Sequence, residues 1–75
     1  MNKYFKDDVK VLNTIVKEIE KMAFNMDEVR EMMQCTDPKR LRKESNRVEI
    51  LAQYFQQISY TLYCMADEIE DENEN

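Results

Sequence analysis

The sequence contains no glycine and no histidine, and it has a single proline, Pro38. Phosphate-binding loops and the tight turns of β-hairpins usually depend on glycine, which excludes a P-loop, a dinucleotide-binding fingerprint and a β-rich fold. Histidine is the commonest general base and the commonest metal ligand. We therefore expect a protein that is not an enzyme, with no catalytic residue, no cofactor-binding residue, no metal site and no cofactor.

The sequence also has few features of an exported or membrane protein. No apolar run approaches the length of a membrane span, and the first residues, MNKYFKDDVK, do not resemble a signal peptide. The two cysteines, Cys35 and Cys64, should be free thiols, buried or half-buried, because one folded helical chain would hold them far apart. Free thiols suit a reducing compartment, so we expect a cytoplasmic protein with no membrane partner.

The length and charge of the chain predict one small acidic domain. The 75 residues are 43% hydrophobic and 36% charged, with a net charge of −5. A lone core of this size is marginal, and the charge disfavours a nucleic-acid partner. We expect residues 1–75 to form a single helical domain whose acidic tail, residues 71–75, frays.

Apolar periodicity predicts a first helix over residues 4–34. One row recurs every seven residues, at Phe5, Leu12, Ile19, Met26 and Met33. A second row follows three residues later, at Asp8, Ile15, Met22 and Val29. Two such rows form the stripe of a packed helix, and strand alternation fits poorly.

A stop-and-restart signal follows at Thr36-Asp37-Pro38. Thr36 or Asp37 can cap a helix, and proline suits the first helical position while disfavouring helix before it. A second helix is predicted over residues 38–70. Its first row is Leu41, Val48, Phe55, Leu62 and Ile69, and its second is Glu44, Leu51, Ile58 and Met65. The row after that is small throughout: Ser45, Ala52, Ser59 and Ala66.

The two helices match in register if the chain folds back at Asp37. Facing residues of the first rows, from Phe5 with Ile69 to Met33 with Leu41, then have numbers that sum to 74. In the second rows Ile15 pairs with Ile58 in the same way, at a sum of 73. Periodicity, turn and register thus agree on an all-α, antiparallel two-helix hairpin.

Large apolar and aromatic side chains outside this stripe predict a second interface. They are Tyr4, Val11, Phe24, Met32, Ile50, Tyr54, Tyr60 and Tyr63. A two-helix hairpin buries one stripe of each helix and leaves the sides of both helices exposed to solvent. We therefore expect these residues to contact another chain. A homodimer forming a four-helix bundle is the simplest solution, and a different helical protein is the alternative.

Basic residues cluster after the turn, at Lys39, Arg40, Arg42, Lys43 and Arg47. Their position early in a helix opposes the helix dipole, which favours a functional role slightly. The alternative function is therefore an RNA-binding hairpin dimer that uses this cluster. A solvated charged surface explains the same run without any ligand.

The predicted architecture resembles three families of short helical hairpins: the plasmid copy-control protein that dimerises and binds RNA loops, the co-chaperone of type III secretion needle subunits, and the WXG100 group. The turn here, QCTDPKR, lacks the WXG motif, and no motif residue carries over from any family. The leading hypothesis is a non-enzymatic interaction protein. It would be a small helical adaptor, co-chaperone or inhibitor, encoded by a phage or plasmid, that acts through an apolar helical surface.

Overall fold

The computed structural model describes the backbone of residues 3–74 and the side chains of residues 6–72. Three helices account for most of it: α1 (Lys3–Met22), α2 (Met26–Met32) and α3 (Pro38–Glu74). No strand occurs among the described residues. The predicted all-α class is confirmed.

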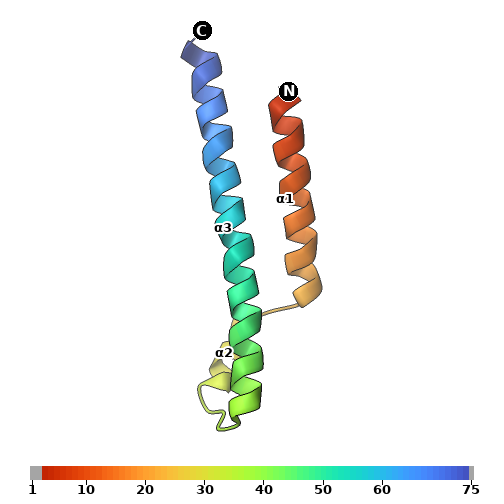
Figure 1. Ribbon diagram of the computed structural model, residues 1–75, viewed down its shortest axis with the longest axis vertical. Coiled ribbons are helices and arrows are strands. Elements are labelled where there is room, and N and C mark those ends of the chain that lie inside the picture. The colour runs from red at the N-terminus through yellow and green to blue at the C-terminus, as the bar shows by residue number, and fades with distance from the viewer. Residues whose placement is uncertain (1–2, 75) are drawn as a thin grey trace.

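The molecule is a rod measuring 58 × 20 × 17 Å. Figure 1 shows α1 running alongside the second half of α3 in the opposite direction, with the start of α1 and the end of α3 near the same tip. The short α2 lies against the first turns of α3, at the other end of the rod. The 37-residue helix α3 therefore runs the length of the molecule, and α1 and α2 pack along it one after the other.

The predicted continuous helix over residues 4–34 is wrong, because the chain breaks between Met22 and Met26. Asn25 has an extended backbone, and its side chain accepts a hydrogen bond from the Glu28 N–H at 3.2 Å. This bond is a helix N-cap, and Asn25 with Glu28 three residues later has the spacing of a capping box. Ala23 adopts the left-handed conformation (φ 50°) that normally suits glycine at a helix end.

The predicted start of the second helix is confirmed. The Lys39 N–H donates to the Asp37 side chain at 3.1 Å, so Asp37 caps α3 and Pro38 is its first residue. The helix continues to Glu74, four residues beyond the predicted end at residue 70. Fraying of residues 71–75 stays a prediction.

The core between α1 and α3 is small. Among the described residues, only Ile15 and Leu51 are buried apolar side chains, at 5% and 4% exposure, and Thr61 is the one buried polar residue. Both apolar residues belong to the second of the two rows found in the sequence. The packing seam is therefore centred on that row, and the first row of α3 lies at its edge.

Candidate interaction surface

The first apolar row of α3 is exposed. Val48, Phe55, Leu62 and Ile69 keep 43%, 56%, 52% and 44% of their surface in contact with solvent. Because they recur every seven residues, they lie on one side of the helix. The small residues Ala52 and Ala66 are exposed beside them. The result is an apolar stripe along most of α3.

Helix α1 and the chain break extend this stripe sideways. A groove of about 240 Å³ is lined wholly by apolar side chains: Ile19, Phe24, Val48, Leu51, Ala52 and Phe55. Leu12 and Val16 lie on the same side of α1 as Ile19, and Val16 is 42% exposed. We call the surface formed by Leu12, Val16, Ile19, Val48, Phe55, Leu62 and Ile69 the apolar face.

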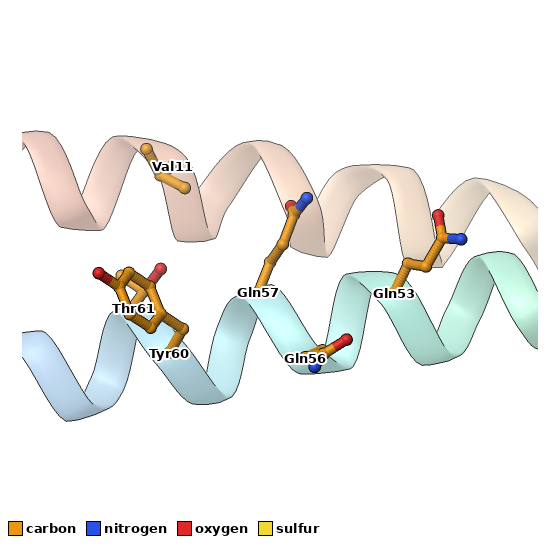
Figure 2. A pocket seen from close by; sticks show the side chains of 6 residues that line it. All are labelled: Val11, Gln53, Gln56, Gln57, Tyr60 and Thr61. Atoms are coloured by element: carbon orange, nitrogen blue, oxygen red, sulfur yellow. The ribbon is translucent and has the colours of Figure 1, made fainter.

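The opposite side of the α1–α3 pair has a different chemistry. A groove of about 550 Å³ there is lined by Val11, Gln53, Gln56, Gln57, Tyr60 and Thr61, and Figure 2 shows Gln53 and Gln57 extending from α3 toward α1. Amides and hydroxyls remain hydrated at little cost, whereas exposed large apolar groups do not. We call this side the polar face. The rod therefore has one groove lined wholly by apolar side chains and, opposite it, a groove in which amide and hydroxyl groups lie among the apolar surfaces of Val11 and Tyr60.

Arg47 holds the three helices together where the chain breaks. Its guanidinium donates to Glu28 of α2 at 2.7 Å, to Glu44 of α3 at 2.9 Å and to the Met22 carbonyl at 2.8 Å. The carbonyl lies at the C-terminus of α1, where a cation is favoured by the helix dipole. The ring of Phe24 lies 5.6 Å from the guanidinium carbon. The hydrogen bond to Glu44, above all, raises the pKa of Arg47.

This use of Arg47 divides the predicted basic cluster. Arg47 is half-buried inside the molecule, and Arg40 lies 3.5 Å from Glu31 of α2. The other three members, Lys39, Arg42 and Lys43, are exposed near the start of α3. The five cations therefore do not form one free surface for a nucleic acid, and Arg47 acts chiefly as a structural residue.

The residues predicted to contact a partner are spread over the rod. Phe24 lines the apolar groove, whereas Val11 and Tyr60 line the polar groove. Met32 lines a third groove with Val29 and Leu41, between α2 and α3. Ile50 and Tyr63 are exposed, Tyr54 is half-buried, and the side chain of Tyr4 lies outside the described residues. The predicted set therefore does not gather on a single face.

Other kinds of site are not found in the part of the chain that the structure describes. Residues 3–74 contain no helix that is long and apolar enough to cross a membrane. Among the same residues, no group of cysteine and carboxylate side chains could hold a metal ion. Cys35 and Cys64 are both free and half-buried, as the sequence predicts. Comparisons with known protein families, curated proteins and solved structures find no match.

Two carboxyl groups face each other near the tip of the rod where α1 begins and α3 ends. Asp8 of α1 and Glu68 of α3 each have one buried side-chain oxygen, and the two carboxyl groups interact with each other. Burial raises the pKa of Glu68 above its ordinary value of 4.5, and the charges of Asp8 and Glu72 raise it further. The folded chain therefore binds a proton at Glu68 more tightly than the unfolded chain does.

This difference predicts a pH-dependent stability. The tighter proton binding at Glu68 contributes its full stabilisation of the fold below pH 4.5. That contribution is lost as the pH rises through the raised pKa of Glu68 in the folded chain. The substitution Glu68→Gln should therefore raise the midpoint of thermal unfolding near neutral pH and lose this advantage on acidification. Circular dichroism melts across this pH range would measure it, with the exposed Glu49→Gln as the matched control. An advantage independent of pH would contradict the prediction.

Proposed function

We propose that this chain is a non-enzymatic protein-interaction module that binds a helical polypeptide on its apolar face. The observation that supports the proposal is the exposure of Val48, Phe55, Leu62 and Ile69 on one side of a single long helix. Exposed apolar patches of this extent on small proteins usually mark interaction sites. An adaptor, a co-chaperone and an inhibitor all act through such a surface.

The shape of the apolar face favours a helix as its ligand. The exposed side chains follow the axis of α3, and the groove formed by Ile19, Phe24 and Phe55 lies between helices. The row next to these side chains contains the small residues Ala52 and Ala66, and their short side chains allow another helix to approach closely. A partner helix would bury its own apolar stripe in this groove, as in other helix-in-groove complexes.

Site-specific photo-crosslinking in living cells that make the protein would test the proposal. A photoreactive amino acid replaces Phe55 on the apolar face or, as the matched control, Gln53 on the polar face. We expect covalent adducts with a polypeptide from position 55, and few from position 53. Equal labelling from both positions, or no polypeptide adduct from position 55, would contradict the proposed function.

A further inference from the structure

We propose that the polypeptide on the apolar face is a second copy of this chain, arranged antiparallel about a two-fold axis near Ser59. The inference rests on the proposed function, because it names the occupant of the same surface. In this arrangement α3 packs on the partner's α3 and α1 lies beside the partner's α1. The two rods together form a four-helix bundle, with each α2 at an outer end.

The first argument is the amount of exposed surface. The chain exposes 6386 Å², whereas a compact monomer of this mass exposes about 4,900 Å². The excess is roughly 1,500 Å². A standard interface buries about 800 Å² on each partner, and permanent homodimers bury more. The apolar face spans residues 48–69 of α3, about 32 Å of the 58 Å length of the rod, so a second copy on it removes part of this excess.

The second argument is the symmetry of the apolar row. The exposed residues Val48, Phe55, Leu62 and Ile69 are evenly spaced, so the row is unchanged when it is reversed about its midpoint near Ser59. An antiparallel copy therefore places Phe55 level with the partner's Leu62, and Val48 level with the partner's Ile69. Every large side chain then meets another, and small Ser59 lies at the axis, where two helices come closest.

The third argument is charge. The start of α3 is basic and its end is acidic, so an antiparallel copy brings opposite charges together at both ends of the bundle. A parallel copy would bring like charges together. The residues concerned are Arg42 and Lys43 at the start, and Asp71 and Glu72 at the end, which this pairing places within about one helical turn of one another along the bundle. This self-complementarity is a property of the chain alone, which favours a second copy over a foreign helix.

The proposal differs from the interface predicted from sequence. That interface used residues such as Val11 and Tyr60, which lie on the polar face. The apolar face includes the first row of α3, which the sequence analysis placed inside the hairpin. Leu41 is the fifth member of that row, but it lines the groove with Val29 and Met32 of α2. The new interface therefore ends where α2 begins.

Light scattering on a sizing column tests the first part of the inference. The chain has a mass of 9.1 kDa, and we expect a single species of twice that mass at tens of micromolar. Phe55→Glu should weaken association on the order of 100-fold or more, because it buries a charge at the centre of the interface. Tyr60→Glu, at a position that is 71% exposed on the polar face, should leave the dimer intact.

Val16→Lys provides a second variant should Phe55→Glu fail to fold, as judged by circular dichroism. A monomeric wild-type chain would overturn the inference, as would dimers that survive Val16→Lys but dissociate with Tyr60→Glu. The proposed function has a separate outcome. If the wild type is monomeric and position 55 crosslinks to a different protein, the function stands and only the second copy is wrong.

Disulfide trapping tests the orientation. In a chain with Cys35→Ser and Cys64→Ser, the further change Ser59→Cys should give a covalent dimer under mild oxidation, because both copies place residue 59 near the axis. Gln53→Cys, on the polar face, is the matched control and should stay monomeric under denaturing conditions. The absence of this disulfide would overturn the arrangement. A parallel in-register pair would also bring the two Ser59→Cys thiols level, so Val48→Cys in the same background separates the two orientations. A parallel pair should form a disulfide through residue 48, whereas the antiparallel pair holds those two thiols about 30 Å apart.

Discussion

Replacing Leu51 by alanine will lower the free energy of unfolding by about 3 kcal/mol, the usual cost of removing a large buried aliphatic side chain. Leu51 is only 4% exposed, and among the described residues it shares the α1–α3 core with one other buried apolar residue, Ile15. A core this small has no second layer that could close the cavity. Because a single core in a chain of this size rarely supplies more than about 3–5 kcal/mol, the substitution should remove most of the stability of the fold.

Ile50→Ala is the matched control for this prediction. It removes a similar side chain one residue away, from a position that is 43% exposed. We expect a loss below about 1 kcal/mol, because little buried surface disappears and alanine favours the helix. Urea unfolding followed by circular dichroism would compare the two variants. An equal loss for both would contradict the small core described above and would favour the sequence-predicted interface, which includes Ile50.

Much of the secondary structure could be predicted from the sequence, because local signals determine it. The capping of α3 by Asp37, with Pro38 in its first turn, follows from side-chain chemistry within a few residues. The break before Met26 also had a local signal, the Asn25…Glu28 capping pattern. Apolar periodicity obscured that signal, since the row of Ile19 and Met26 continues across the break. No glycine marked the end of α1, because Ala23 takes the left-handed conformation.

The apolar face was only half predictable from sequence. Its residues were identified as one apolar row, but the sequence does not show which of two adjacent rows faces α1. The two rows are three residues apart, so they lie only about 60° from each other around the helix axis. Packing decides which of them faces α1. In the structure Leu51 turns inward and Phe55 stays 56% exposed. A pairing rule based on residue sums cannot separate sums of 73 and 74 when both rows are apolar.

The basic cluster shows the same limit for charged residues. Arg47 belongs to a run of cations in sequence, yet it is the member that binds Glu28, Glu44 and the Met22 carbonyl. Glu28 lies 19 residues from Arg47 in the sequence and Met22 lies 25 residues from it, so only the tertiary structure brings them together. The run of like charges is therefore two groups: a structural arginine and an exposed basic tip.

Replacing Arg47 by alanine should release α2 from the rod. The change removes the hydrogen bonds to Glu28 and Met22 together and leaves the two carboxylates, Glu28 and Glu44, close without a cation between them. Helix α2 has only seven residues and no buried side chain, so it has little else to hold it. We expect amide hydrogen exchange in α2 to accelerate on the order of tenfold or more, since bonds to charged groups are the stronger ones.

The change Arg42→Ala is the matched control, since it removes the same charge from an exposed position five residues earlier in α3. It should leave exchange in α2 unchanged. Exchange in the middle of α3 should stay slow in both variants, because Leu51 and Ile15 hold that region independently of the break. Equal acceleration throughout the chain would mean that Arg47 supports the whole fold, and no acceleration in α2 would mean that packing against Leu41 and Val48 holds α2 without it.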